Sequence, residues 1–380
     1  MSVTAETVRE ALKAIKSPEG VDLAASGKLS DIVVTDGKVF FSLTVDAAQA
    51  QVWEEVRKSA ETAVRAIPGV ASVLVALTAE RTSGGARTPQ PNRESQRAAA
   101  PRPGASPTGT ARAVPGIESV IAVASGKGGV GKSTTAVNLA LGLRDLGLKV
   151  GVLDADIYGP SMPRLLAVKT KPETIGGRTL RPVEAYGMKV MSIGFLVDEE
   201  TPMIWRGPMV MSAITQMLRE VEWGALDVLV VDMPPGTGDA QLTLAQQVPL
   251  AGAVIVSTPQ DLALIDARRG IAMFRRVDVP VLGLVENMSY FLCPHCGKRT
   301  DIFSHGGAQS EAEKTGVPFL GEVPLDAVIR ETSDSGLPVV ATRPDSPHAQ
   351  VYREIAKRVR AELERGRTSG KTAPKIVIES

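Results

Sequence analysis

The 380-residue sequence contains little cysteine, few aromatic residues and almost no net charge. Its two cysteines, Cys293 and Cys296, lie too close together to form a disulfide framework, so we expect a reducing, cytoplasmic compartment. The 43 basic and 42 acidic side chains leave a net charge of +1, which argues against a nucleic-acid-binding protein that depends on overall positive charge. The N-terminus lacks the apolar core of a secretory signal. Apolar runs such as residues 226–231 and 251–256 are far shorter than the roughly 20 residues of a membrane-spanning helix, so we expect no membrane partner.

The composition predicts two folded domains joined by a linker. Aromatic residues make up only 4% of the chain and hydrophobic residues 43%, which favours the aliphatic core of a parallel α/β sheet. Residues 82–115 are rich in Pro, Gly, Ala, Ser and Arg and are predicted to be a disordered linker. Residues 1–81 are predicted to form a small αββαβ domain, with helices at 4–15 and 51–67 and strands at 31–35, 38–45 and 70–77. Asp36-Gly37 is a strong hairpin-turn signal between the first two strands.

Alternating strands and helices follow the linker. The strands are predicted at residues 119–124, 149–154, 226–232, 251–257, 280–286 and 319–323. This alternation indicates an α/β fold with a parallel sheet over residues 116–366, in which ligands bind at the carboxyl ends of the strands. The last helix is predicted to end at Gly366, followed by a polar tail, residues 367–380, without an amphipathic stripe.

A phosphate-binding loop follows the first of these strands. Residues 126–133 match G-x-x-x-x-G-K-[ST] between a strand and a helix. The loop N–H groups converge on phosphate oxygens, Lys132 neutralises the β and γ phosphates, and Ser133 ligates magnesium. The motif therefore predicts bound ATP and Mg²⁺, with contacts from Gly126, Lys127, Gly128, Gly129, Val130, Gly131, Lys132, Ser133 and Thr134.

Carboxylates follow two neighbouring strands. Asp232 closes an aliphatic strand and is the predicted magnesium residue, and Asp156 is the candidate for positioning the attacking water. Asp154 can support either role. The Pro234-Pro235-Gly236 turn is predicted to be a switch whose Gly236 N–H senses the γ-phosphate.

The cysteine pair lies in a Cys-Pro-His-Cys-Gly loop just past a strand. Zinc and iron-sulfur clusters typically need four ligands, so two thiolates leave such a site incomplete. His295 is poorly placed to complete it from within the same turn. A second chain can supply the missing pair, or the cysteines can act as a redox dithiol, although no helix follows them as in a thioredoxin-like motif.

The string GKGGVGKS resembles the deviant Walker A class of the nitrogenase iron protein, MinD and ParA ATPases. The resemblance implies that Lys127 reaches the nucleotide of the partner subunit, and therefore that the protein is a homodimer. Two cysteine pairs that meet on the two-fold axis then best account for the missing ligands. The alternative is a ParA- or MinD-like positioning ATPase with a structural zinc at the CxxC, but the basic surface for DNA or membrane is weak.

GKGGVGKST, DADIYGPSMP, WRGPM, DMPPGTGD and VENMSYFLCPHCG, in this order, resemble the Mrp (ApbC-like) family of iron-sulfur cluster carrier ATPases over residues 116–364. The resemblance implies a homodimer that holds a labile 4Fe-4S cluster between Cys293 and Cys296 of both chains. It also implies that the cluster comes from a donor scaffold and passes to apo iron-sulfur proteins, with ATP binding and hydrolysis needed for the cycle. Lys127, Lys132 and Asp156 are the implied catalytic residues, Asn287 the adenine contact and Pro324 a base-pocket residue.

The N-terminal unit resembles the small iron-sulfur-assembly domain that many bacterial members carry. The cysteine usually found after its second strand is absent, because residues 45–48 read VDAA. We therefore expect this domain to dock targets or tune the ATPase rather than to act through a thiol.

Overall fold

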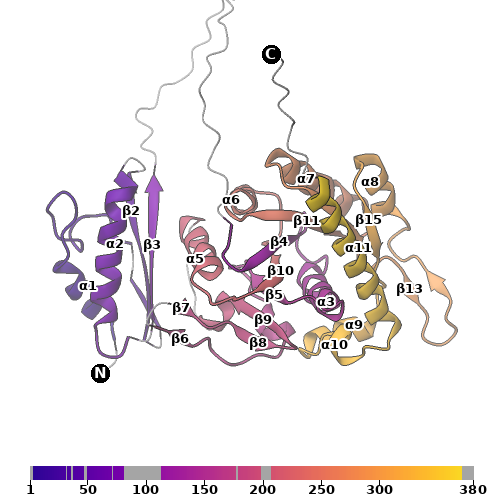
Figure 1. Ribbon diagram of the computed structural model, residues 1–380, viewed down its shortest axis with the longest axis horizontal. Helices are drawn as coiled ribbons and strands as arrows, with labels where there is room; N and C mark the ends of the chain where they lie inside the picture. Colours follow the sequence, from indigo (N-terminus) through magenta and orange to yellow (C-terminus); the bar gives the residue numbers. More distant parts are fainter. Residues whose placement is uncertain are drawn as a thin grey trace, which may run out of the picture. The chain divides into compact units, whose positions relative to one another are not determined.

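The computed structural model describes residues 3–30, 32–35, 37–46, 49–70, 72–80, 113–176, 179–197 and 207–369. These form two compact units within Met1–Thr110 and Ala111–Ser380, each described here by itself (Figure 1). The predicted linker, residues 82–115, lies outside the described residues except for its last three positions. Most of the predicted tail also lies outside them.

The N-terminal unit has the predicted αββαβ order. Its elements are α1 (Ala5–Lys13), β1 (Val33–Thr35), β2 (Lys38–Asp46), α2 (Ala50–Arg65) and β3 (Ser72–Glu80). The hydroxyl of Thr4 caps α1 by accepting a hydrogen bond from the Thr7 N–H. Strands β1 and β2 are antiparallel, as the turn signal predicts, although Asp36 itself lies outside the described residues. β3 joins β2 in parallel, and the buried core includes Phe41 and Trp53.

The second unit contains an eight-stranded sheet whose order is β15-β12-β11-β4-β10-β5-β9-β8. All pairs are parallel except β8 with β9. The bounds are β4 (Ile117–Ala124), β5 (Val150–Asp154), β8 (Val183–Ala185), β9 (Met188–Ser192), β10 (Leu226–Asp232), β11 (Leu250–Ser257), β12 (Val281–Glu286) and β15 (Phe319–Glu322). All six predicted strands are present. The β8–β9 hairpin was not predicted.

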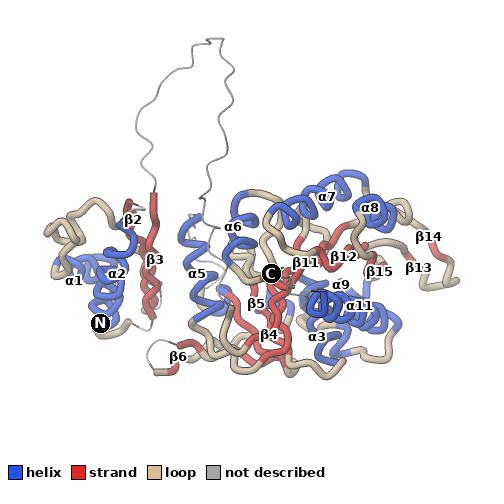
Figure 2. The backbone as a smooth tube through the Cα atoms, turned by 45° about the horizontal axis from the view of Figure 1, so that its top comes forward, coloured by secondary structure: helices blue, strands red, loops and turns tan. Residues whose placement is uncertain are grey.

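Helices cover both faces of this sheet (Figure 2). One face carries α3 (Lys132–Asp145), α9 (Ala327–Asp334), α10 (Val339–Thr342) and α11 (Pro347–Ser369), and the other carries α5 (Gly207–Arg219), α6 (Asp239–Gln247), α7 (Asp261–Arg276) and α8 (Gly307–Thr315). Short elements complete the unit: α4 (Met162–Leu165), the 3-10 turn Ile193–Phe195, and the two-stranded pairs β6 (Thr174–Ile175) with β7 (Thr179–Leu180) and β13 (Phe291–Leu292) with β14 (Arg299–Thr300).

The last helix differs from its prediction. α11 continues three residues past Gly366, to Ser369. Beyond that glycine, the Arg367 guanidinium donates hydrogen bonds to Glu118 (3.1 Å) and to the Ser119 hydroxyl (2.9 Å). These contacts with β4 hold the extra turn. Gly366 does not have a left-handed backbone conformation, and it therefore does not end the helix.

The core of the second unit is aliphatic, as the composition predicts. Side chains of the central strands, such as Ile121, Val152, Val230 and Val254, are buried between the two helical layers. Because the central strands are parallel, their carboxyl ends and the loops that follow β4, β5, β10 and β12 meet at one edge. In the described part of the chain, no helix has the length and apolar character needed to span a membrane.

Candidate functional site

The loop between β4 and α3 is shaped by glycines that other segments approach closely. Gly131 starts α3 in the left-handed region, with φ of +79°. A Cβ atom there would lie 2.1 Å from Asn287 Nδ2, and one on Gly126 would lie 2.3 Å from the backbone carbon of Asp266. These two positions therefore require glycine.

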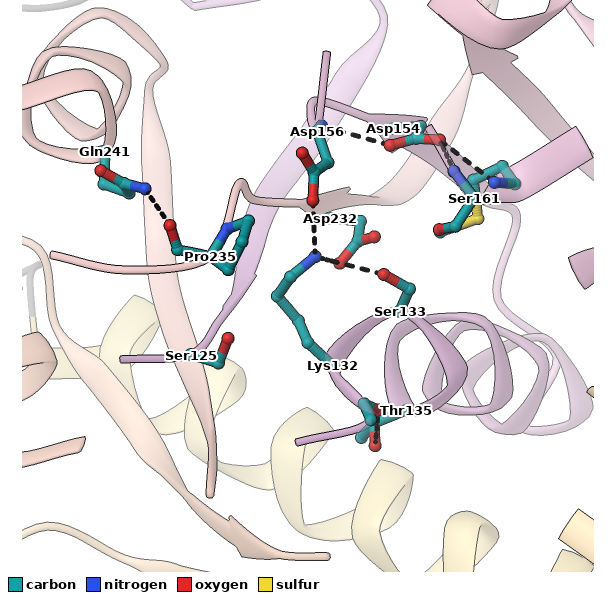
Figure 3. Close-up of polar contacts among 12 residues, drawn as sticks. Ser125, Lys132, Ser133, Thr135, Asp154, Asp156, Ser161, Asp232, Pro235 and Gln241 are labelled. Carbon is teal, nitrogen blue, oxygen red and sulfur yellow. Dashed lines mark hydrogen bonds and ion pairs between the residues drawn. The ribbon is translucent and has the colours of Figure 1, made fainter. Parts of the chain in front are cut away.

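Lys132 lies at the centre of a buried charged cluster (Figure 3). Its Nζ lies 2.6 Å from Asp232 Oδ1, 3.9 Å from Asp156 Oδ2 and 3.2 Å from Ser133 Oγ. Only 6% of the lysine side chain is exposed. The structure thus brings together four of the residues that the sequence assigned to phosphate, magnesium and water.

Asp154 braces the loop after β5. Its carboxylate accepts hydrogen bonds from the backbone N–H groups of Ser161 (3.0 Å) and Met162 (3.1 Å) and from the Ser192 hydroxyl (2.9 Å). Burial raises the pKa of Asp154 to about 7, and the negative charge of Asp232 adds to this shift. Its hydrogen bonds hold the loop that carries Asp156, so Asp154 acts as a support of the site.

The pKa of Asp156 is also raised. Burial is the main cause, and the positive charge of Lys132 opposes it. A carboxyl group with a raised pKa is a better proton acceptor when ionised. This property suits a residue that orients a water molecule.

The residues around Asp232 fit a magnesium ion. Asp232 Oδ2 is buried and has no hydrogen-bond partner among the described residues, although burying an unpaired carboxylate oxygen is costly. Carboxylate and hydroxyl oxygens, here from Asp232 and Ser133, are ligands that magnesium prefers. No group of three or more His, Cys, Asp or Glu side chains within the described ranges could hold a metal ion. Magnesium can nevertheless bind here because it usually takes further ligands from phosphates and water.

Two cavities adjoin at the start of α3. The P-loop cavity, about 280 Å³, is lined by residues that include Lys127, Lys132 and Asp156. The Asn287 cavity, about 160 Å³, is lined by residues that include Asn287, Met288, Pro324 and Leu325. Both cavities are lined by Gly131 and Thr134, so a ligand with phosphates in the first can place a base in the second.

The remaining predicted nucleotide residues lie around these cavities. Asn287 Nδ2 donates to the Val130 carbonyl (2.8 Å), which ties the loop after β12 to the P-loop. The Gly236 N–H donates to the Ser125 carbonyl (2.9 Å) and must exchange that bond before it can contact a γ-phosphate. Lys127 lines the P-loop cavity, and its ammonium group has no hydrogen-bond or ion-pair partner among the residues that the structure describes.

The two cysteines lie on a short ribbon, which we call the thiol ribbon, formed by β13, β14 and the loop between them. The Cys293 N–H donates to the Lys298 carbonyl (3.0 Å), and Cys296 is exposed. Hydrogen bonds from the backbone N–H groups of His295 and Cys296 lower the pKa of the Cys293 thiol. The thiolate, which is the metal-binding form, is therefore favoured at Cys293.

Sequence reasoning missed the residues that anchor this ribbon. The Arg299 guanidinium lies 4.2 Å from the centre of the Tyr290 ring and 3.3 Å from a carboxylate oxygen of Glu322. Met288, which lines the Asn287 cavity, was also missed. The sequence gives no signal for these contacts, since they join segments that meet only in the fold.

The parallel sheet, the glycine loop and the acids at the strand ends define a P-loop NTPase. Residues 116–360 match the family model described as NUBPL iron-transfer P-loop NTPase, and residues 5–75 match the model described as iron-sulfur cluster assembly protein. The chain therefore belongs to this family of iron-sulfur cluster carrier P-loop NTPases and has the N-terminal assembly-type domain, as the resemblance implied.

Known proteins agree with this assignment. An "iron-sulfur cluster carrier protein" of Synechocystis is 43% identical over 370 residues, which cover 94% of this chain and 97% of that protein. The "iron-sulfur cluster transfer protein NUBPL" of Dictyostelium discoideum is 57% identical over 260 residues, which cover 68% of this chain and 80% of that protein. A solved ADP complex of a nucleotide-binding protein from Archaeoglobus fulgidus has a TM-score of 0.54 and 42% identity, and the match covers 62% of this chain and 91% of that chain.

Proposed function

We propose that this chain is a cytoplasmic ATPase that carries a 4Fe-4S cluster between two copies of itself and passes it to apo iron-sulfur proteins. The observation that carries the proposal is the pair Cys293 and Cys296 on an exposed ribbon, with no third protein ligand in the described ranges. A cluster needs about four ligands, and two identical chains supply four thiolates around a two-fold axis. The names of two relatives, an iron-sulfur cluster carrier and an iron-sulfur cluster transfer protein, support the same cargo.

The exposure of Cys296 suits a carrier rather than a structural metal site. A cluster that must leave has to be reached by the thiols of a recipient, and Cys296 is exposed. The lowered pKa of Cys293 favours ligation without burying the cluster. Transfer then exchanges carrier thiolates for recipient thiolates, so the metal cluster is the cargo.

The P-loop cavity supports the ATPase half of the proposal. In the structure the Lys132 ammonium is paired with Asp232, and we expect it to move to the β and γ phosphates when ATP binds. Asp232 and Ser133 would hold magnesium, which supplies positive charge against the phosphates. Asp156 then orients the attacking water, and Asn287 and Pro324 line the base pocket.

Anaerobic reconstitution tests the carrier proposal. We expect the wild-type chain to bind about one cluster per two chains, shown by iron and sulfide counts, visible absorption and a doubled mass in solution. The double variant Cys293→Ala, Cys296→Ala should bind none. His295→Ala, which changes the same loop but keeps both thiols, is the matched control and should keep the cluster.

Two results would contradict the proposal. One is a wild-type chain that binds only zinc at the cysteine pair, as a positioning ATPase with a structural zinc would. The other is a wild-type chain that hydrolyses ATP but takes up no cluster. Transfer is checked separately by adding an apo-ferredoxin and following its own absorption spectrum.

A further inference from the structure

The Asn287 cavity and the thiol ribbon belong to one short stretch of chain. Cys293 lies six positions after Asn287, and the residues between them run from the cavity wall into β13. Met288, the next wall residue, has a φ of +56°, which is unusual for a residue other than glycine. Met288 thus has a strained backbone just before the thiol ribbon begins. Ligand binding at such a residue can change the conformation of the segment that follows it.

Hydrogen bonds attach this stretch to the opposite wall of the cavity. The Ser289 N–H donates to the Val323 carbonyl (2.9 Å), and the Leu325 N–H donates to the Tyr290 carbonyl (2.7 Å). A second contact also holds Ser289, because its hydroxyl donates to the buried carboxylate of Glu286 (2.6 Å). The two walls are therefore tied together where β13 begins.

Arg299 connects the other strand of the ribbon to the same place. It begins β14, stacks on the ring of Tyr290 at 4.2 Å, and lies 3.3 Å from Glu322 at the end of β15. Its remaining contacts are with Asp301 Oδ1 (2.9 Å) and His305 Nδ1 (2.8 Å). Glu322 lies two positions before Pro324, and Tyr290 two positions after Met288. The Arg299 guanidinium thus contacts Tyr290, which follows one cavity wall in the chain, and Glu322, which precedes the other.

We propose that Arg299 is a positioning residue that makes the thiol ribbon respond to a purine base in the Asn287 cavity. A base that fills the cavity contacts Met288 on one wall and Pro324 on the other, and so restricts both. Because Arg299 joins the residues that follow these walls, the restriction reaches the strands that hold the cysteines. The inference rests on the proposed function of this site, since it names the route by which nucleotide controls the cluster ligands.

Such coupling is reciprocal and depends on the base. A nucleotide that orders the ribbon must bind more tightly when the ribbon is already ordered, for example by a cluster. Phosphates alone fill the P-loop cavity without touching Met288 or Pro324, because these residues line only the Asn287 cavity. ADP and pyrophosphate therefore separate a route through the base from a route through the phosphates. Because both ligands lack a γ-phosphate, a difference between their effects does not come from contacts with that group.

Hydrogen exchange of the full-length, metal-free protein is the experiment. The reporters are the N–H groups of Cys293 and Gly297, which are hydrogen-bonded within the ribbon. Saturating ADP with magnesium should slow their exchange about fivefold or more, and saturating pyrophosphate with magnesium should not. Equal slowing by both ligands, or by neither, would overturn the proposal.

Arg299→Met tests the residue itself. The variant keeps much of the side-chain length but removes the charge and the ring stacking, so the ADP-specific slowing should fall to less than about twofold. Glu322→Gln should reduce it in part. The control Arg360→Met removes an exposed helical ion pair with Glu364 on α11 and should keep the full ADP effect.

The readout separates positioning from general stability. A merely structural Arg299 would speed exchange equally with and without ADP, and this result would count against the proposal. The metal-free protein is used, so the outcome does not depend on cluster binding. Failure to assemble any cluster contradicts the carrier function, whereas loss of the ADP-specific difference contradicts only the role of Arg299.

Discussion

At the residue scale, the carboxylate of Asp232 is central to the charged cluster around Lys132. Lys132 is paired with Asp232, which is the residue that we propose would hold magnesium, so the lysine and the metal would use the same carboxylate. A buried carboxylate without a cation would be costly, and Lys132 provides that cation for Asp232. In the proposed function, nucleotide and magnesium together would replace this pairing, since the phosphates would attract the lysine and Asp232 would hold the metal.

Asp154 gives a pH-dependent prediction. Its pKa is raised by burial to about 7 in the folded protein, against 3.8 for an ordinary aspartate. The folded state therefore binds this proton more tightly than the unfolded chain, and folding stability falls as the pH rises from about 4 to about 7. Asp154→Asn cannot titrate, so its unfolding free energy should lose this downward slope, which is about 1.4 kcal/mol per pH unit at most.

Urea unfolding at several pH values measures how the unfolding free energy of the metal-free wild type and of Asp154→Asn depends on pH. The Asn side chain keeps one oxygen that accepts hydrogen bonds from the loop, so the variant is expected to fold. Identical pH dependence in the two proteins would contradict the raised pKa of Asp154.

At this scale the sequence located the contiguous phosphate-binding loop, but it did not predict the contacts that support the loop. The P-loop residues are adjacent in the chain, so one pattern finds them all. The role of Asp154 depends on Ser161, Met162 and Ser192, and these come together only after β9 has paired with β5. For that reason the sequence left its role open between metal and water.

At the element scale, the glycine loop is fixed by α7 as well as by its own motif. Gly126 leaves no space for a side chain, because a Cβ atom there would lie 2.3 Å from the backbone carbon of Asp266. Gly126→Ala must therefore displace α7 or the loop and should cost about 1–3 kcal/mol of stability. Gly128 provides a matched control in the same loop, since a Cβ atom there meets nothing within 4 Å.

Gly128→Ala should change the unfolding free energy by less than about 0.5 kcal/mol. Urea unfolding of the nucleotide-free proteins separates packing from phosphate binding, because no ligand is present in the measurement. Equal losses of unfolding free energy in both variants would show that loop flexibility, rather than contact with α7, determines whether the loop tolerates alanine.

Elements with strong local patterns were predicted, and elements held by distant contacts were not. Aliphatic runs between turn signals identified six of the eight strands of the large sheet, which are β4, β5, β10, β11, β12 and β15. The β8–β9 hairpin has short strands and turns at Tyr186-Gly187, which is not a common hairpin pair. Its turn is held from outside, because the Tyr186 hydroxyl donates to the Gly336 carbonyl (2.9 Å), 150 positions away in the chain.

At the scale of the whole molecule, two features have chemistry that one chain leaves incomplete. The cysteine pair lacks further metal ligands, and the Lys127 ammonium lacks a partner, among the residues described. Both features suit an assembly of two chains. A pairing of Lys127 with the nucleotide of the other chain predicts a specific pattern of activity in mixed dimers.

Lys127→Ala and Asp156→Asn should each abolish ATP hydrolysis in a pure dimer, because every site lacks either the lysine or the water-orienting acid. In a mixed dimer, the site on the Lys127→Ala chain has its own Asp156 and receives Lys127 from the other chain. Random pairing of equal amounts then restores about a quarter of the wild-type rate, since half of the dimers are mixed and each has one complete site. Phosphate release from the two variants, separately and mixed, measures this. If Lys127 acted within its own chain, no mixed dimer would contain a complete site and the mixture would stay inactive.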